Sequence, residues 1–524
     1  MIQNPILRGF CPDPSILRAG ADYYLATSTF EWWPGVKLFH STDLKHWERL
    51  PGPLRREDQL NMAGDPTSGG VWAPCLSWDG TQFYLLFTDV KTKKGRFYNT
   101  HNYLVHAADP RGDWSKAVYL NSVGFDPSLF HDVDGRKYLI NMVNGFRGIL
   151  VQELETETFA LVGPQKKVYD GSGIGCTEGP HMYHIGAWYY LLVAEGGTGY
   201  SHCVTLARSR SVWGPFETMP DNPLLTSDAQ NPAALQKCGH ADLVETQNGE
   251  WYLAHLCSRP LAGQALCPLG RETALQKLCW RADGWPELTG GGRFAKIMVE
   301  EPAGIPNAPF PESGPDFFTD FDADTLDVRL QSPRVPPLYS LTARPGWLCL
   351  TGRESLNSLH HVSLVAVSQE ELAATAETLL DFAPKKPEQM AGLAYLYDAM
   401  NFYLLVQTAN ENGDVQLCLL KSDGGVITDL CTPIPLPAGP VELKAETSDD
   451  GGSVRFFYAL NERWEPVGER QSTELVTDEH CRGFTGAQFG LYVHDMTGGG
   501  LVADFDYLHV SYKVRSETQS EQGG

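Results

Sequence analysis

Three acidic residues stand at the beginning of similar short sequences, although they are far apart in the chain. Asp13 begins Asp13-Pro14-Ser15-Ile16, Asp126 begins Asp126-Pro127-Ser128-Leu129, and Glu178 begins Glu178-Gly179-Pro180-His181. Ala73-Pro74-Cys75-Leu76 and His240-Ala241-Asp242-Leu243 have the same pattern, and each of these tetrads precedes an apolar run centred on a tyrosine. If the tetrads are equivalent parts of repeated units, their leading side chains lie close together in space.

Carboxyl groups that share a partly dry site change each other's pKa, so that one can stay protonated while another is ionised. Glycoside hydrolysis requires such a pair, because one acid protonates the leaving oxygen while an ionised carboxylate activates water or attacks carbon. Taken singly, each residue has an ordinary interpretation: Asp13 as a turn residue, Glu178 as a solvated loop acid and His240 as a hydrogen-bonded core histidine. The equivalent positions of three acids favour the catalytic interpretation, with the third acid tuning the other two.

The elements that must position these residues are predicted to be strands. The tyrosines that follow the tetrads, at positions 24, 84, 138, 190 and 252, recur at intervals of 60, 54, 52 and 62 residues. An interval of this size in an all-β chain suits four short strands with their turns, which is one blade of a propeller. We therefore expect a five-bladed β-propeller over residues 1–305, whose innermost strands bring the tetrads to one end of its axis.

A chain of 524 residues exceeds what one hydrophobic core usually serves, so a second domain is expected. Four prolines within residues 302–311 indicate a stiff linker, which we place at 306–316. From residue 317 the sequence alternates between apolar and polar positions again, and turn residues separate the runs. This pattern predicts a β-sandwich over residues 317–513, followed by a polar tail at 514–524.

The composition is that of a globular protein, with 42% apolar and 20% charged residues. The 41 basic and 64 acidic residues give a formal net charge of −23, which argues against nucleic-acid and anionic membrane partners and favours a neutral or small ligand. The N-terminal sequence does not have the pattern of a secretory signal, so a cytoplasmic location is expected unless such a segment has been trimmed. The 12 cysteines include no Cys-x-x-Cys pair, which is typical of free thiols in a reducing compartment. A homo-oligomer is compatible with the sequence.

Aromatic residues make up 11% of the chain and could serve as sheet-packing residues or as flat faces on which sugar rings stack. Phe30 and Trp72 lie next to predicted inner strands and are candidates for either role. Arg271, in Gly270-Arg271-Glu272-Thr273, carries a planar fork of donors that suits a carboxylate or sugar hydroxyls.

In combination, these motifs resemble glycoside hydrolase family 43, specifically its two-domain β-xylosidases, along essentially the whole chain. The segments that carry the resemblance are Asn4-Pro5-Ile6-Leu7, Pro12-Asp13-Pro14-Ser15, Ser28-Thr29-Phe30-Glu31-Trp32, Gly70-Val71-Trp72-Ala73-Pro74, Gly124-Phe125-Asp126-Pro127-Ser128, Thr177-Glu178-Gly179-Pro180-His181 and Leu269-Gly270-Arg271-Glu272-Thr273. The resemblance implies an all-β fold, in which a five-bladed propeller precedes a concanavalin-like jelly-roll sandwich, and an inverting mechanism.

The resemblance also implies roles for single residues. Asp13 would be the general base, Glu178 the general acid and Asp126 the residue that modulates and orients the acid. The residues implied to bind the terminal sugar are Phe30, Trp72, Ala73, Thr198 and Arg271, with Phe484 of the second domain closing the pocket. His240 matches the position that in many relatives faces a calcium ion through ordered waters, and no other cofactor is expected.

The implied activity is removal of terminal xylose from β-1,4-xylo-oligosaccharides, with side activity on α-L-arabinofuranosides and on arabinose-substituted oligosaccharides. Two alternatives stay open: an enzyme that is primarily an α-L-arabinofuranosidase, and a non-catalytic sugar-binding lectin. Two stretches depart from the family pattern, because residues 141–148 are shorter than expected and residues 171–175 are unusually small. Both are expected to border the site that receives the leaving group.

Overall fold

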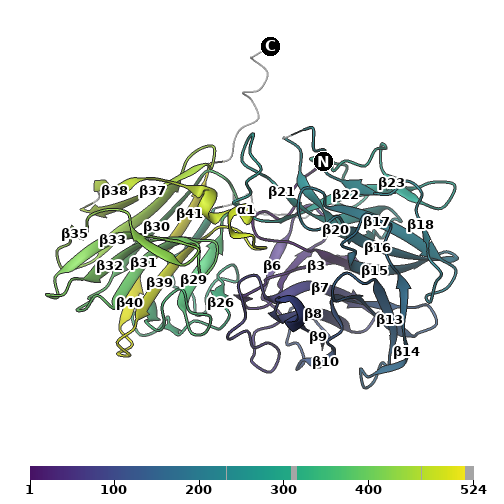
Figure 1. Ribbon diagram of the computed structural model, residues 1–524, viewed down its shortest axis with the longest axis horizontal. Coiled ribbons are helices and arrows are strands. Elements are labelled where there is room, and N and C mark those ends of the chain that lie inside the picture. The colour runs from purple at the N-terminus through teal and green to yellow at the C-terminus, as the bar shows by residue number, and fades with distance from the viewer. Residues whose placement is uncertain (232, 308–315, 462, 514–524) are drawn as a thin grey trace, which may run out of the picture. The chain divides into compact units, whose positions relative to one another are not determined.

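The computed structural model describes residues 1–231, 233–307, 316–461 and 463–513, and strands dominate it (Figure 1). The chain forms two compact units. The first contains Met1–Arg259 and the chain from Arg271 to the predicted linker. The second contains Pro260–Gly270 and most of the chain after that linker. Pro333–Val335 belong to the first unit. The predicted boundaries at 305 and 317 therefore do not include two short segments, Pro260–Gly270 and Pro333–Val335, that pack with the other unit. Most of the predicted linker and the whole tail at 514–524 lie outside the described residues. No helix in the described ranges is long and apolar enough to span a membrane.

The first unit is a five-bladed β-propeller. Its five antiparallel sheets follow one another along the chain, and the first strand of each sheet contacts the first strand of the next, in a ring that returns to β2. The blades consist of β2 (Ser15–Ala19), β3 (Asp22–Thr27), β5 (Lys37–Ser41) and β6 (Glu48–Leu50); β7 (Gly70–Trp78), β8 (Phe83–Thr92), β9 (Asn99–Ala107) and β10 (Val118–Asn121); β11 (Gly124–His131), β12 (Lys137–Val143), β13 (Ile149–Leu154) and β14 (Leu161–Tyr169); β15 (Glu178–Ile185), β16 (Trp188–Glu195), β17 (Cys203–Ser209), β18 (Glu217–Thr218) and β19 (Leu225–Thr226); and β20 (Gln236–Glu245), β21 (Trp251–Ser258), β22 (Glu272–Trp280) and β23 (Pro286–Leu288). The short elements β4 (Trp32–Trp33) and η1 (Gly95–Phe97) lie between these strands.

The five repeated tyrosines occupy the second strand of each blade. They are buried in β3, β8, β12, β16 and β21, directly after the inner strands that carry the tetrads. A large ring at the same place in every blade fills the space between neighbouring sheets, because blades diverge from the axis outward. The repeat interval therefore identified the blades correctly.

The N-terminal segment closes the propeller ring. β1 (Ile2–Gln3) pairs with β24 (Met298–Val299), and the backbone of Leu7 pairs with Thr273 of the last blade. The backbone N–H of Gly9 donates to the Glu272 carboxylate at 2.8 Å, and both Glu272 oxygens accept hydrogen bonds from Arg259. These contacts hold the chain around residues 9–13 against the strand that follows Arg271.

The second unit is a β-sandwich with nine strands in one sheet and seven in the other. Strand β30 alternates between buried and half-buried positions, as expected for a sheet with one face on the core. The larger sheet contains β25 (Phe317–Thr319), β27 (Tyr339–Ser340), β28 (Leu348–Thr351), β30 (Ala374–Asp381), β36 (Val441–Thr447), β37 (Ser453–Leu460), β38 (Arg463–Ser472), β40 (Val502–Phe505) and β41 (Leu508–Tyr512), and the smaller contains β29 (Ser363–Ser368), β31 (Gln389–Leu396), β32 (Phe402–Ala409), β33 (Val415–Asp423), β34 (Val426–Asp429), β35 (Ile434–Pro435) and β39 (Gln488–Asp495). The two-residue strand β26 (Ser332–Pro333) lies between β25 and β27 in the chain and belongs to neither sheet.

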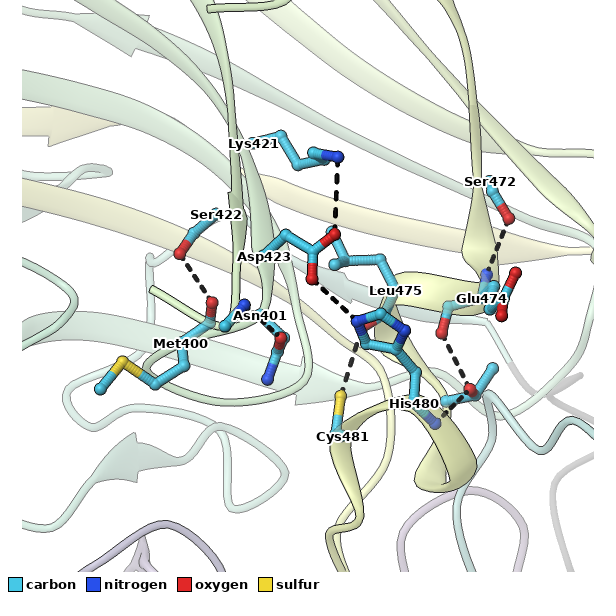
Figure 2. Close-up of polar contacts among 12 residues, drawn as sticks. Met400, Asn401, Lys421, Ser422, Asp423, Ser472, Glu474, Leu475, His480 and Cys481 are labelled. Carbon is cyan, nitrogen blue, oxygen red and sulfur yellow. Dashed lines mark hydrogen bonds and ion pairs between the residues drawn. The ribbon is translucent and has the colours of Figure 1, made fainter. Parts of the chain in front are cut away.

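Two short helical turns connect the sheets of the second unit. Ser472 caps η2 (Thr473–Val476), and Thr477 caps α1 (Asp478–Cys481). Figure 2 shows how α1 is attached: the His480 ring lies 3.0 Å from the Asp423 carboxylate, and the Cys481 thiol donates to the carbonyl of Leu475 at 3.2 Å. These contacts fix the start of the loop that carries Phe484.

Candidate functional site

Four of the five tetrads lie where an inner strand bulges, whereas the first tetrad begins just before β2, which pairs with β3 in regular register. The register between the first and second strands shifts between Trp72 and Cys75, between Phe125 and Ser128, between Glu178 and His181, and around His240. A bulge re-aims the side chain of the extra residue and is frequent beside functional sites. The repeated bulge is therefore the local structure that turns these side chains out of the sheet.

Two of the acids have a backbone conformation that residues with a side chain rarely adopt. Asp13 has φ of 54° and Asp126 has φ of 52°, and His240 shares the conformation with φ of 41°. Each such residue costs about 1–2 kcal/mol, and strain of this kind is concentrated at functional sites. Pro12 and Pro14 flank Asp13, and their own fixed φ limits the movement of the chain on either side of this acid.

Asp13 is buried and surrounded by donors. The Ser28 hydroxyl donates to Oδ2 at 2.7 Å, Arg271 Nη1 donates to Oδ1 at 3.3 Å, and the His240 ring lies 3.9 Å from Oδ1. Burial alone would raise the pKa of Asp13, but the Arg271 charge, His240 and the Ser28 hydrogen bond together hold it below its usual value. Since burial also lowers the pKa of His240 to about 4, that ring is neutral at neutral pH, and Arg271 and Ser28 exert most of the effect.

Glu178 is buried beside Asp126, and its pKa is shifted in the opposite direction from that of Asp13. Burial and the charge of Asp13 raise the pKa of Glu178 to about 8. Burial and the charges of Glu178 and Asp13 raise the pKa of Asp126 well above its usual value, although its Oδ2 accepts a hydrogen bond of 3.0 Å from the Gly179 backbone N–H. At neutral pH the site therefore contains an ionised Asp13 and a protonated Glu178.

The axis next to the acids is polar and tightly packed. The Asp242 carboxylate accepts hydrogen bonds from the Ser15 hydroxyl at 2.8 Å and from the Tyr183 hydroxyl at 2.5 Å. The His240 ring lies against the Cα of Gly179, where an added Cβ would be 2.8 Å from the ring. In the described part of the chain, no three His, Cys, Asp or Glu side chains are grouped to hold a metal ion. A cation beside His240 would therefore have to keep water ligands.

Aromatic side chains border the acids within the first unit. Phe30 lies beneath the Arg271 guanidinium, with 5.3 Å between the guanidinium carbon and the ring centre, and its ring centre is 6.3 Å from that of Trp72. Trp72 donates from its indole to the Ser68 carbonyl and meets Phe125 edge-on at 5.0 Å. Ala73 is buried in the bulge that follows Trp72. The structure thus brings together the three acids, Phe30, Trp72, Ala73 and Arg271.

Thr198 lies, half-buried, in the loop after β16. This loop is joined to the stretch at 171–175, because Gly196 N–H donates to the Gly175 carbonyl at 2.8 Å. Buried Glu195 holds the same stretch by accepting from Ser172 N–H and from the Thr177 hydroxyl. The predicted role of Thr198 at the sugar subsite stays a prediction.

Phe484 belongs to the second unit and is half-buried. Its neighbour Thr485 donates from its backbone to the Tyr397 hydroxyl at 3.1 Å, and a Cβ on Gly483 would lie 2.4 Å from the Tyr397 ring. The loop is therefore held tightly on its own sandwich. Its predicted closure of the pocket depends on the relation between the two units and stays a prediction.

Several residues at the site were not assigned roles from the sequence. Ser28 follows β3, and the antiparallel pairing of Ser15 with Ala26, continued by two residues, brings it opposite Asp13. The hairpin register was the signal that could have identified it. Tyr98 and Phe125 also border the acids. Tyr98 lies at no repeated position, whereas Phe125 precedes its tetrad as Trp72 does.

A propeller that gathers an ionised and a protonated carboxyl group on its inner strands has the architecture and the acid pair of a glycoside hydrolase. Residues 2–286 match Glycosyl hydrolases family 43, and residues 319–511 match the β-xylosidase C-terminal concanavalin A-like domain. A β-xylosidase from Bacillus subtilis (strain 168) is 42% identical over 98% of this chain and 100% of its own. Xylosidase/arabinosidase 43B from Humicola insolens is 43% identical over 97% of both chains.

A solved structure agrees closely with this chain. The crystal structure of the xylan β-1,4-xylosidase from Bacillus halodurans C-125 is 47% identical, covers 98% of this chain and 100% of its own, and superposes with a TM-score of 0.94. The chain therefore belongs to glycoside hydrolase family 43 and carries the concanavalin A-like domain of its β-xylosidases. The predicted fold class and family are confirmed.

Proposed function

We propose that the protein removes single xylose units from the non-reducing ends of β-1,4-xylo-oligosaccharides with inversion of configuration, and that α-L-arabinofuranosides are secondary substrates. The observation that supports this best is the opposite protonation of two buried carboxyl groups, Asp13 and Glu178, beside one arginine. This is the arrangement that an inverting hydrolysis needs at neutral pH. The choice of sugar is supported by the similarity to β-xylosidases and to a xylosidase/arabinosidase.

In the proposed mechanism, ionised Asp13 takes a proton from a water molecule as that water attacks the anomeric carbon. Glu178 gives its proton to the glycosidic oxygen as the bond to the leaving sugar breaks. Asp126 orients Glu178 by accepting a hydrogen bond from the Gly179 backbone N–H, while burial and the charge of Asp13 keep the pKa of Glu178 raised. When the products leave, a proton returns from Asp13 to Glu178 through solvent.

The remaining predicted residues are proposed to bind the terminal sugar. Phe30 and Trp72 would present ring faces, Ala73 would leave room for the sugar, and Arg271 would hold hydroxyl groups. Thr198 would line the same subsite, and Phe484 would close it. A pocket closed at one end admits only a chain terminus, which is the reason for proposing exo action.

Replacing Asp13 or Glu178 by Ala tests the assignment. Each variant is expected to lose nearly all turnover of xylobiose, and thermal unfolding measures whether the fold is kept. The stereochemistry is tested independently by NMR, because an inverting enzyme first releases α-xylose. Retained turnover in either variant, or first-formed β-xylose, would contradict the proposal.

Rates measured on two nitrophenyl glycosides distinguish the proposed xylosidase from the rival, an enzyme that is primarily an α-L-arabinofuranosidase. We expect kcat/KM for nitrophenyl β-D-xylopyranoside to exceed that for nitrophenyl α-L-arabinofuranoside, and the reverse order would favour the rival. A non-catalytic lectin would bind xylobiose without forming xylose. The opposite protonation of Asp13 and Glu178 gives a lectin no advantage, which is why we favour the enzyme.

We also propose that a calcium ion lies beside His240 and contacts it through ordered waters. A neutral imidazole can accept a hydrogen bond from a coordinated water, and Ca²⁺ prefers oxygen ligands. When bound, the ion would contribute positive charge near the acids. Thermal unfolding with calcium and with chelator measures its binding independently of activity, and identical unfolding temperatures would contradict it.

The cellular setting is proposed from composition and burial. Buried thiols at Cys75, Cys203 and Cys238 suit the reducing cytoplasm. The net charge of −23 favours uncharged oligosaccharide partners over nucleic acid and membrane surfaces. Size-exclusion chromatography would establish whether the protein forms a homo-oligomer.

A further inference from the structure

A cavity lies on the propeller beside Phe125, the residue before Asp126. Its volume is about 400 Å³, within the range of small-ligand sites, and its walls come from two loops. The first loop, around η1, contributes Arg96 and Tyr98, and the second, after β12, contributes Asn144, Phe146 and Arg147. Phe125 forms the wall between them.

This cavity adjoins the catalytic centre through its aromatic side. Phe125 directly precedes Asp126, and its ring centre is 6.0 Å from that of Tyr98 and 6.1 Å from that of Phe146. Burial, followed by the charges of Asp126 and Glu178, raises the pKa of Tyr98. Phe125 and Tyr98 therefore form the side of the cavity that faces the acids.

The outer side of the cavity is cationic. Arg147 donates from Nε to the Asn144 carbonyl at 2.8 Å, which fixes the guanidinium and leaves its terminal nitrogens for other partners. Neither Arg96 nor Arg147 pairs with a carboxylate among the residues that the structure describes, although the chain has 64 acidic residues and a net charge of −23. Phe146, with 43% of its surface exposed, lies between Asn144 and Arg147 in the sequence and offers a ring face.

We propose that this cavity binds the leaving-group side of the substrate and that Arg96 and Arg147 recognise a carboxylate on it, as in a xylose unit substituted with a uronic acid. Guanidinium groups bind carboxylates through paired, charge-assisted hydrogen bonds, and aromatic rings stack on sugar faces. The combination suits a sugar ring that carries an acid. This inference rests on the proposed xylosidase function and specifies its substrate class.

The test compares two substrates that differ in one carboxyl group. The first is xylobiose whose reducing-end xylose carries a glucuronic acid, and the second is the same compound after reduction of the carboxyl group to the alcohol. For the full-length enzyme in low salt we expect kcat/KM to be about tenfold higher for the acid, the factor of one charge-assisted hydrogen bond. Raising the salt to 1 M should reduce this preference, because both arginines are exposed.

Variants locate the effect. Arg96→Met and Arg147→Met should each reduce the preference, and the double variant should bring it close to one. Arg136→Met is the matched control, because Arg136 is also exposed but lies in the turn at the other end of β12. It should keep the full preference.

The outcomes are separable. Turnover of xylobiose without any preference for the acid, or a preference that persists in the double variant, would overturn this inference alone, whereas failure to hydrolyse xylobiose would overturn the proposed function. Inorganic phosphate is compared with chloride at the same ionic strength. Phosphate should lower the preference more than chloride does, because it competes with the carboxylate for the same guanidinium groups, and equal effects of the two salts would contradict a specific carboxylate site.

Discussion

Arg271 and Asp13, which are 258 residues apart in the sequence, form a hydrogen bond of 3.3 Å between Nη1 and Oδ1. The backbone joins them as well, because Cys11 N–H donates to the Arg271 carbonyl at 2.9 Å. The same contact that closes the propeller ring therefore places a permanent positive charge beside the ionised acid. That charge lowers the pKa of Asp13 and also opposes the upward shift at Glu178.

Removing the Arg271 charge is expected to move the whole pH profile of kcat/KM upward. In Arg271→Met the pKa of Asp13 rises, so the base becomes protonated at a higher pH and the acidic limb moves up. The pKa of Glu178, about 8 in the intact protein, also rises, so the basic limb moves in the same direction. Arg271→Lys keeps a charge and should restore part of the shift. Limbs that stay in place in Arg271→Met would show that the arginine only binds substrate.

Ser28→Ala provides a narrower change at the same carboxylate. The Ser28 hydroxyl donates to Asp13 Oδ2 at 2.7 Å. The pKa of Glu178 is shifted by burial, Asp13 and Arg271 rather than by Ser28. Loss of this charge-assisted hydrogen bond, worth about 1.5–3 kcal/mol, should raise the acidic limb by about one pH unit or more and leave the basic limb unchanged. Movement of both limbs would contradict this, and Ser28→Thr, which keeps a hydroxyl, is the control.

The sequence predicts the parts of this site that repeat. Asp13, Asp126 and Glu178 were found because each blade has a similar tetrad before its tyrosine, and the tyrosine interval supplied the number of blades. Ser28 and Glu195 were not found because they lie at the end of a second strand. Only the strand pairing brings Ser28 to Asp13 and brings Glu195 to Thr177, the residue before Glu178. The positions of such residues depend on how neighbouring strands pair, and composition and spacing alone do not determine this pairing.

The same reasoning explains why the leaving-group side was predicted only in outline. The shortened stretch at 141–148 was expected to border the leaving group, and Asn144, Phe146 and Arg147 do line a cavity beside Phe125. The contribution of Arg96 comes from an unrelated loop in the preceding blade, and nothing in its local sequence connects it with Arg147. Residues 260–270 pack with the second unit although they lie within the sequence of the first. Their composition does not indicate this packing.

Glu178→Gln should depend on the quality of the leaving group. Gln is similar in size but cannot donate a catalytic proton, so hydrolysis of xylobiose is expected to fall by about 10²–10⁴. A nitrophenolate leaves without protonation, so the rate on nitrophenyl xyloside should fall much less. The basic limb near pH 8 should disappear with it, because Glu178 is the group that deprotonates there. Equal losses on both substrates would contradict its role as general acid.

Glu195→Gln is expected to loosen the segment that leads to Glu178. Both Glu195 oxygens accept hydrogen bonds: Oε1 from the Thr177 hydroxyl at 3.0 Å and Oε2 from the Thr205 hydroxyl at 2.6 Å. The Ser172 backbone N–H also donates to both oxygens, so the amide nitrogen of Gln would face this donor in either orientation. The conflict should cost about 1–3 kcal/mol, and the unfolding temperature and kcat should both fall. Glu217→Gln, at a side chain that is 56% exposed, is the control and should change neither. An unchanged kcat would show that Glu195 serves stability alone.

Gly179→Ala separates a clash at the site from the general cost of a side chain in left-handed backbone. Gly179 has φ of 56°, and an added Cβ would lie 2.8–3.1 Å from three atoms of the His240 ring. Gly186, at the other end of β15, has φ of 61° with no atom within 4 Å of its added Cβ. Gly186→Ala should therefore lose only about 1–2 kcal/mol of stability and keep full activity.

Gly179→Ala should lose the same amount and more, because the His240 ring must move and the hydrogen bond from Gly179 N–H to Asp126 is displaced with it. Since Glu178 is the preceding residue, we expect kcat/KM on xylobiose to fall at least about 100-fold, as misplacement of a catalytic group by about 1 Å does. Thermal unfolding and kcat/KM measured on both variants test this. If Gly179→Ala behaves like Gly186→Ala in both measurements, the packing of His240 on Gly179 does not position the acid.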